Sequence, residues 1–201
     1  AMSIIPIIVT IVIVLLALFV TAIYFPKLEK YVQIICMIPY TIQGVILSVS
    51  ILSLYVGSSS ILSNRLVMLM GAYCIVILPY IYQGIRNGMR SVNMPTLIEA
   101  AEMLGASKIY AFFRVVVPNI LSAIIVSSLL AVGIIFGDYV LIRNLAGTSA
   151  PNMQIFLYQT MKSDSTKASA VFVVIMFVTF VITAIVLFMK SREAKEKTHR
   201  K

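Results

Sequence analysis

The sequence predicts an all-α protein, a polytopic membrane helix bundle of five helices, from three observations. Hydrophobic residues make up 61% of the chain and charged residues only 11%, and the mean hydropathy is +1.04, outside the usual balance of soluble domains. The apolar residues form continuous runs, and roughly 20 such residues cross about 30 Å of hydrocarbon as a helix. These runs lack the period-two alternation of a membrane β-barrel. Helices also satisfy their own backbone polar groups in lipid.

Five apolar runs are candidate membrane spans: Ile4–Tyr24, Val32–Val56, Leu66–Tyr82, Ile120–Phe136 and Ala168–Met189. The first is too long for a signal-peptide core and has no basic leader, so we expect it to span the membrane. Proline removes a backbone donor and kinks a helix, so Pro39 and Pro79 predict kinks in the second and third spans. No repeat or low-complexity linker divides the chain, so residues 1–201 are expected to form one transmembrane domain.

Two connections carry local signals. Pro26 is expected to end the first helix, and Gly57–Ser60 has the composition of a short turn between the second and third spans. The longest connection on the side expected to face outward, Gly137–Lys167, contains a segment that is too short and too polar to span, and we expect a short surface or partly inserted helix there.

The placement of Lys and Arg predicts the orientation. With a cytoplasmic C-terminal tail, twelve of the sixteen basic residues lie inside, and Arg65, Arg143, Lys162 and Lys167 are left outside. This asymmetry follows the positive-inside rule and puts the N-terminus outside. The net charge of +9 is therefore read as topology, and the basic tail as a solvated segment beside anionic lipid rather than a nucleic-acid surface.

A polar and basic segment, Glu99–Pro118, separates the third and fourth spans. Pro95 suits the first turn of a helix, and Thr96 with Glu99 has the spacing of a capping box. Four residues then recur at helical spacing and predict one apolar stripe on this short helix: Leu97, Ile98, Ala101 and Leu104.

Gly105 and Ser107 predict how this helix ends and the next begins. Glycine readily takes the left-handed conformation that closes a helix, and serine is a favoured N-cap. We therefore expect a small cytoplasmic knob that presents Glu99 and small alanines, with the acid free to accept charge-assisted hydrogen bonds from a partner.

The segment resembles the EAA loop of the permease subunits of binding-protein-dependent ABC importers, whose pattern is EAA-x3-G-x9-I-x-L-P. Five positions match, and two carry valine where the family has Ile and Leu: Glu99, Ala100, Ala101, Gly105 and Pro118, then Val115 and Val117. The resemblance implies a type I importer (MetI-like) permease core in the bacterial inner membrane. It also implies a cytoplasmic coupling loop within residues 85–118, in which Thr96–Ser107 docks into an ATP-binding subunit. A membrane-surface amphipathic helix is the alternative.

The resemblance further implies partners: ABC ATPase subunits that hold ATP and Mg, a second permease chain, identical or homologous, and an external solute-binding protein. Family permeases often carry one more helix before the position of the first span, so this chain resembles the core without that leading helix. The segment Phe136–Gly147, FGDYVLIRNLAG, is most similar to permeases of the polyamine, aminoethylphosphonate and ferric-iron branch.

The chain itself offers little chemistry, so we expect it not to be an enzyme and to hold no cofactor. It has no Gly-rich phosphate loop and no Ser/His/Asp set. His199 stands without a second ligand in the tail. Cys36 and Cys74 lie in separate spans, where they are read as small apolar residues.

Candidates for a solute path are few. Tyr40, Gln43 and Asp138 are the chosen residues, because polar groups in membrane spans are costly and mark pathways. Asp138 has three interpretations: it attracts a cationic group in the path, it pairs with Arg143, or it sits at the interface. Several serines can also line a wet route or join helices by hydrogen bonds: Ser48, Ser50, Ser122, Ser127 and Ser128.

A second class of function is a secondary transporter or channel-like protein without ATP coupling, in which Asp138 is a proton or ion site. Inverted repeats would favour it, and the sequence shows none. Co-purification with an ATPase subunit would support the importer, whereas ion-driven flux by this chain alone would support the second class.

Overall fold

The computed structural model describes residues 3–42, 44–55, 64–147 and 153–199. Within these residues all regular structure is helical, which confirms the all-α membrane fold. Three helical stretches are long and apolar enough to cross a membrane: α1 (Ile4–Ile23), α4 (Arg65–Ser91) and the Ser165–Ile185 part of α10 (Ser165–His199). Two bent helix pairs raise the number of spans to five if each pair counts as one.

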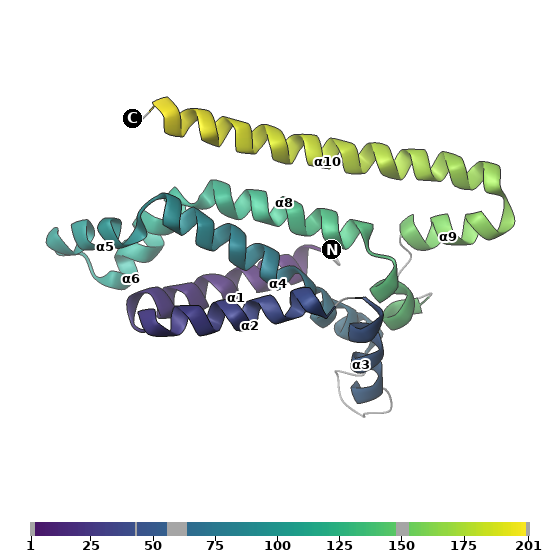
Figure 1. Cartoon of the computed structure of the whole chain (residues 1–201), viewed down its shortest axis with the longest axis horizontal. Helices are drawn as coiled ribbons and strands as arrows, with labels where there is room; N and C mark the ends of the chain where they lie inside the picture. The colour runs from purple at the N-terminus through teal and green to yellow at the C-terminus, as the bar shows by residue number, and fades with distance from the viewer. Residues whose placement is uncertain (1–2, 43, 56–63, 148–152, 200–201) are drawn as a thin grey trace.

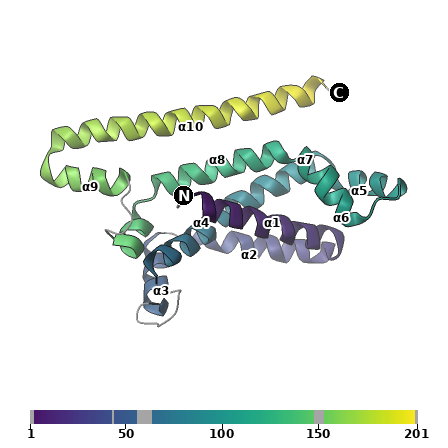
Figure 2. The ribbon, with the colours of Figure 1, turned by 180° about the vertical axis from the view of Figure 1, so that it is seen from behind.

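Helix α4 is the centre of the bundle, and α1 and α8 (Leu121–Gly137) pack most extensively against it. Its fully buried side chains follow the helical period and include Tyr73, Ile77 and Ile81. These apolar side chains pack into the core, where α1 and α8 contact α4. Helix α10 runs alongside α8 as an outer layer in Figures 1 and 2, with α9 (Met153–Ser163) folded back beneath its first turns.

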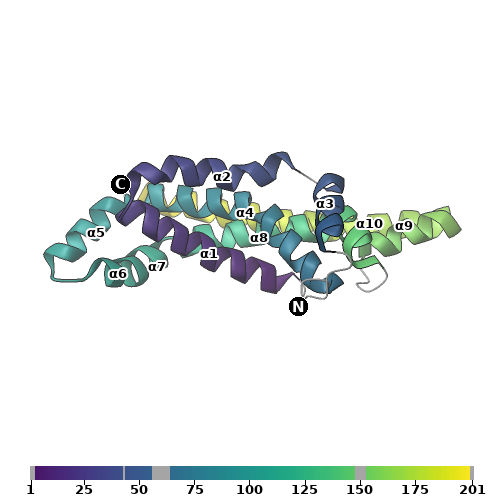
Figure 3. The ribbon, with the colours of Figure 1, turned by 90° about the horizontal axis from the view of Figure 1, so that it is seen from below.

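The first two helices form a hairpin. Helix α1 ends at Ile23, and Pro26 opens the short turn η1 (Pro26–Leu28), as the proline predicts. Helix α2 (Glu29–Thr41) then returns along the bundle, and in Figure 3 α1 and α2 lie on the two sides of α4.

The second predicted span, Val32–Val56, is wrong as a single helix. Helix α2 ends at Thr41, Ile42 is extended, and α3 (Val45–Tyr55) begins at an angle of 98° to α2. Gly44, the residue before α3, has a φ of +60°, in the left-handed region that glycine adopts without strain. Pro39, where the sequence predicts a kink, lies inside α2 about one turn before the break between α2 and α3.

The third and fourth spans also have different limits. Helix α4 contains Pro79 and continues beyond the predicted end at Tyr82 as far as Ser91. The fourth span is preceded by three short helical pieces that meet α8 at 64°: α6 (Lys108–Ala111), η3 (Phe112–Val116) and α7 (Val117–Asn119).

The bundle has two distinct ends (Figure 1). One carries α5 (Met94–Met103), the α1–α2 turn and the end of α10. The other carries α3, α9 and the turn η4 (Ile142–Ala146). They are called here the α5 end and the α9 end. The predicted turn Gly57–Ser60 lies outside the described residues.

Candidate functional site

The short helix α5 begins at a sharp reversal of the chain. Asn93 takes φ 53° and ψ 57°, a left-handed conformation that asparagine tolerates. Helix α5 therefore starts at Met94 with Pro95 in its first turn, as predicted. The predicted capping box is wrong, because Thr96 lies inside α5 and the N-cap residue Asn93 makes no side-chain capping bond.

The end of α5 explains the EAA-x3-G spacing. Gly105 has φ +84°, which confirms the predicted left-handed residue. The N–H of Ala106 donates to the carbonyl of Ala101 at 3.0 Å, and the N–H of Gly105 donates to that of Glu102 at 2.9 Å. These two bonds are the paired closure of a Schellman motif. The second alanine of the EAA triplet and the glycine thus occupy fixed positions of one turn.

The next helix begins as predicted. The Ser107 Oγ accepts a hydrogen bond from the N–H of Tyr110 at 3.3 Å and caps α6. Across the turn, Glu102 lies 3.7 Å from the Lys108 ammonium, but both side chains are well exposed. An exposed pair of this kind adds little stability, so the backbone bonds define the turn.

Helix α5 buries only part of its predicted apolar stripe. Ile98 and Ala101 are buried, and Leu97 is half-buried. Leu104 is 89% exposed and its neighbour Met103 is 90% exposed, so the stripe prediction is wrong at its last residue. Leu104 has φ −88° and ψ 9° at the C-cap, past the last regular turn, which turns its side chain away from the face of the helix that packs inward.

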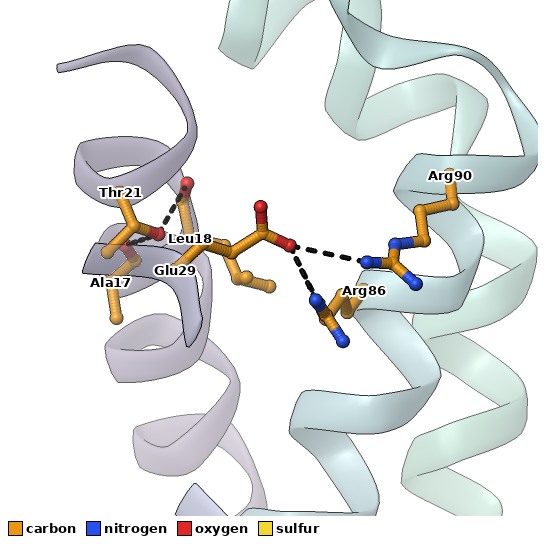
Figure 4. A network of polar contacts seen from close by, with 6 residues as sticks. All are labelled: Ala17, Leu18, Thr21, Glu29, Arg86 and Arg90. Atoms are coloured by element: carbon orange, nitrogen blue, oxygen red, sulfur yellow. Dashed lines mark hydrogen bonds and ion pairs between the residues drawn. The ribbon is translucent and has the colours of Figure 1, made fainter. Parts of the chain in front are cut away.

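Glu99 and Ala100 are exposed on α5. Glu99 also lines a cavity of about 520 Å³ that separates α5 from α1, α2 and α4. Glu29 of α2 lines the same cavity and contacts two arginines of α4: Arg86 Nη2 at 2.7 Å and Arg90 Nη2 at 3.7 Å (Figure 4). The α1–α2 hairpin is thereby tied to the part of α4 that leads into α5.

Helices α4 and α8 approach closely through small residues. A Cβ atom at Gly84 would lie 2.5 Å from Ser127 Cβ, and one at Gly88 would lie 2.6 Å from Ala123 Cβ. Both distances are too short for real atoms. The four-residue spacing of small residues on each helix is typical of tightly packed membrane helices.

A groove of about 350 Å³, lined by both polar and apolar side chains, runs beside this contact. Tyr80, Gln83, Asn87 and Ser91 line it from α4 at helical spacing, and Asn119 and Ser122 are among the residues that line it from the other side. The side chains that line it carry amides, hydroxyls and apolar groups and no formal charge.

Sequence reasoning missed Gln83 and Asn87, because it ended the third span at Tyr82 and therefore placed neither residue on a membrane helix. The signal was the polar spacing of three and four residues that continues from Tyr80 to Ser91. Tyr40, one of the predicted path residues, reaches this region: its ring centre lies 5.8 Å from that of Tyr80. Gln43 lies outside the described residues.

Asp138 lies elsewhere, at the end of α8. Its carboxylate accepts hydrogen bonds from the N–H groups of Leu141 (3.5 Å) and Ile142 (3.3 Å) and from the Tyr73 hydroxyl (3.2 Å). Burial raises the pKa of the Asp138 carboxyl above its ordinary value, and these hydrogen bonds oppose the shift. Arg143, the predicted alternative partner, donates instead to the Tyr139 hydroxyl at 2.7 Å.

The predicted serines mostly bond to their own helices. Ser127 and Ser128 donate to the carbonyls of Ala123 (2.8 Å) and Ile124 (2.7 Å). Ser48 is fully buried and accepts a bond from Asn144 Nδ2 at 2.7 Å, which joins α3 to η4. In the part of the chain that the structure describes, no three His, Cys, Asp or Glu side chains gather as metal ligands.

Residues 1–193 match the family described as "Binding-protein-dependent transport system inner membrane component". The chain belongs to this family. Membership agrees with the helical membrane fold and with the EAA-type turn of α5, and it makes the chain a permease component of a transport system of the ABC importer type. A comparison with curated proteins gives no match.

Proposed function

We propose that this chain is the membrane permease subunit of an ATP-driven ABC importer, in which α5 docks into a separate ATPase subunit. The tip of α5 carries this proposal. Met103 and Leu104 are almost fully exposed, and the Schellman bonds of Gly105 and Ala106 fix the turn beneath them. Burying one such side chain is favourable by roughly 1.5 to 3 kcal/mol, so a protein groove that covers both has a substantial driving force.

Helix α5 also carries two acidic side chains that a partner can bind. Glu99 and Glu102 are exposed on the same short helix, and each can accept charge-assisted hydrogen bonds from basic side chains of a partner. ATP and Mg would be held by that partner. In this proposal the α5 end faces the cytoplasm, together with the end of α10, and the α9 end faces an external solute-binding protein.

The groove between α4 and α8 is our candidate for one wall of the solute path. Its amides and hydroxyls suit a polar solute. The Tyr40 ring contacts that of Tyr80, one of the residues that line the groove. A second permease chain, identical or homologous, would supply the opposite wall. A polyamine or an aminoethylphosphonate stays a hypothesis for the solute, based on the resemblance of Phe136–Gly147, and the uncharged lining does not select between them.

The decisive experiment is co-purification with the ATPase subunit encoded with this chain, in mild detergent. Met103→Ser with Leu104→Ser is expected to abolish stable association and uptake, because it removes the apolar tip but no core contact. Leu28→Ser is the matched control, since Leu28 is also an exposed apolar residue at the α5 end. It is expected to recruit the ATPase normally.

Two results would contradict the proposal. One is full ATPase recruitment by the Met103→Ser, Leu104→Ser variant. The other is ion-driven solute flux by the purified chain alone in liposomes, which would support the alternative of a secondary transporter.

A further inference from the structure

At the α9 end, two cations share one aromatic ring. The Arg143 guanidinium carbon lies 4.7 Å from the ring centre of Tyr158, and the Lys162 Nζ lies 4.8 Å from the same centre. The two positive charges are therefore within about 10 Å of each other, close to the distance over which salt screens charges in water. Both side chains are exposed.

The ring system holds the arginine in a fixed orientation. The Arg143 Nη1 donates to the Tyr139 hydroxyl at 2.7 Å, and the rings of Tyr139 and Tyr158 lie 5.0 Å apart. A guanidinium has five N–H donors, so others stay available for a bidentate contact with a carboxylate. Because the side chain is already ordered, it loses less conformational entropy on binding than a free arginine does.

Among the described residues, no carboxylate forms an ion pair with either cation. Of the seven acidic residues of the chain, only Asp138 and Asp164 fall in the sequence that builds the α9 end. Asp138 accepts hydrogen bonds from Tyr73 and from the start of the η4 turn. Asp164 pairs with Lys167 at 3.3 Å and caps the start of α10. The ion pairs of the described residues include neither Arg143 nor Lys162.

The local potential is positive enough to act on the ring itself. A hydrogen bond from Lys162, together with the charges of Lys162 and Arg143, lowers the pKa of the Tyr158 hydroxyl below its usual value. The cluster of Arg143, Tyr139, Tyr158 and Lys162 is thus an ordered, exposed and unneutralised cationic surface.

We infer that this cluster docks a carboxylate-bearing surface of the solute-binding protein. The inference rests on the proposed function, which places the α9 end outside and assigns that partner to it. Complementary charge across such a contact raises the association rate and fixes the orientation of the partner. The rings of Tyr139 and Tyr158 add apolar area, so the partner surface is expected to carry apolar side chains beside its carboxylates.

The test measures binding of the purified solute-binding protein encoded with this transporter to the full complex in nanodiscs. Arg143→Gln with Lys162→Gln is expected to weaken binding about tenfold and to reduce its salt dependence. The binding-protein concentration that half-saturates ATPase stimulation should rise, while the maximal rate stays unchanged. Lys167→Gln is the matched control, because Lys167 is a basic residue of the same end that Asp164 already pairs.

A second pair of variants separates the ring platform from folding. Tyr158→Phe keeps the ring and should bind nearly as the wild type does, whereas Tyr158→Ala should resemble the double charge variant. Equal losses in Lys167→Gln and in the double variant, or no loss in the double variant, would overturn the inference. A loss seen only in anionic lipid would assign the cluster to lipid phosphates and also overturn it. Failure of the wild-type complex to bind the partner would instead refute the proposed function.

Discussion

Glu29 and Arg86 lie 57 residues apart in the sequence and join α2 to α4 through a 2.7 Å ion pair and a 2.9 Å hydrogen bond from Arg86 Nε. The Arg86 side chain is 14% exposed and that of Glu29 is 35% exposed, so the pair is shielded from water better than a surface pair. Arg86 lies in the last turns of α4, which leads through Asn93 into α5. The contact therefore connects the first hairpin to the helix that carries the proposed docking surface.

The first prediction concerns this pair. Glu29→Gln and Arg86→Gln should each lower the free energy of unfolding by about 2 kcal/mol, because each leaves a charged partner with a weakened hydrogen bond. The double variant should be less destabilised than the sum of the two single variants. Thermal unfolding in detergent measures both effects. The same cycle on Glu102 and Lys108, an exposed pair, should give coupling close to zero, and equal coupling in the two cycles would refute the assignment.

The second prediction concerns the contact of α4 with α8. Gly84→Ala and Gly88→Ala should each destabilise the bundle by about 1 to 3 kcal/mol, because the added methyl group forces packed helices apart. Gly71→Ala on the same helix is the control, since nothing lies within 4 Å of a Cβ atom there. Melting temperatures decide the point, and equal shifts at all three positions would contradict it.

The third prediction concerns Gly105. Gly105→Pro should abolish ATPase recruitment and leave the bundle folded, because proline requires φ near −65° and the turn has +84°. No atom lies within 4 Å of the Cβ position, so the cost comes from the backbone and not from crowding. Gly105→Asn should retain most recruitment, since asparagine tolerates the left-handed region. Normal recruitment by Gly105→Pro would show that the turn is not needed.

The fourth prediction concerns Asp138 and pH. Its pKa is raised in the fold, so the folded state holds the proton more tightly than the unfolded chain. The contribution of Asp138 to stability should fall as pH rises from the ordinary carboxyl range through the raised pKa, and stay constant above it. Asp138→Asn should remove this pH dependence and keep an acceptor for the N–H groups of η4. Asp138→Ala should be less stable at every pH. The difference in stability between the wild type and Asp138→Asn isolates this contribution, and a difference that shifts in favour of the wild type as pH rises would contradict the argument.

The fifth prediction concerns orientation. In a background without Cys36 and Cys74, Lys30→Cys at the α5 end should react with an impermeant thiol reagent only after permeabilisation. Ser163→Cys at the α9 end should react in intact cells. Both positions are exposed. Reversed labelling would overturn the proposed placement of both partners.

Much of the fold could be predicted because membrane spans and turns are encoded locally. The apolar runs give the spans, and Pro26, Pro95, Gly105 and Ser107 mark helix ends with conformations that these residues favour. The Schellman turn follows directly, since its bonds join residues five or fewer positions apart.

What the sequence did not predict depends on contacts between distant segments. One partner of Asp138 is Tyr73, 65 residues away, and the Arg143 guanidinium lies over the Tyr158 ring instead of pairing with Asp138, which is nearer in sequence. Gln83 and Asn87 were missed because polar residues at a span end look like loop until the helix is seen to continue. Leu104 fits the helical period, but the helix ends just before it.

The break between α2 and α3 constrains what can surround this chain in a membrane. At this end of α3 the Ser48 N–H donates to the Gly44 carbonyl at 3.0 Å. The first N–H groups of a helix that begins at such a break need partners outside its own hydrogen-bond ladder. Hydrocarbon cannot satisfy such groups. Acyl chains alone therefore cannot surround the start of α3, and the partners of these N–H groups must come from the protein itself, from water or from another polypeptide.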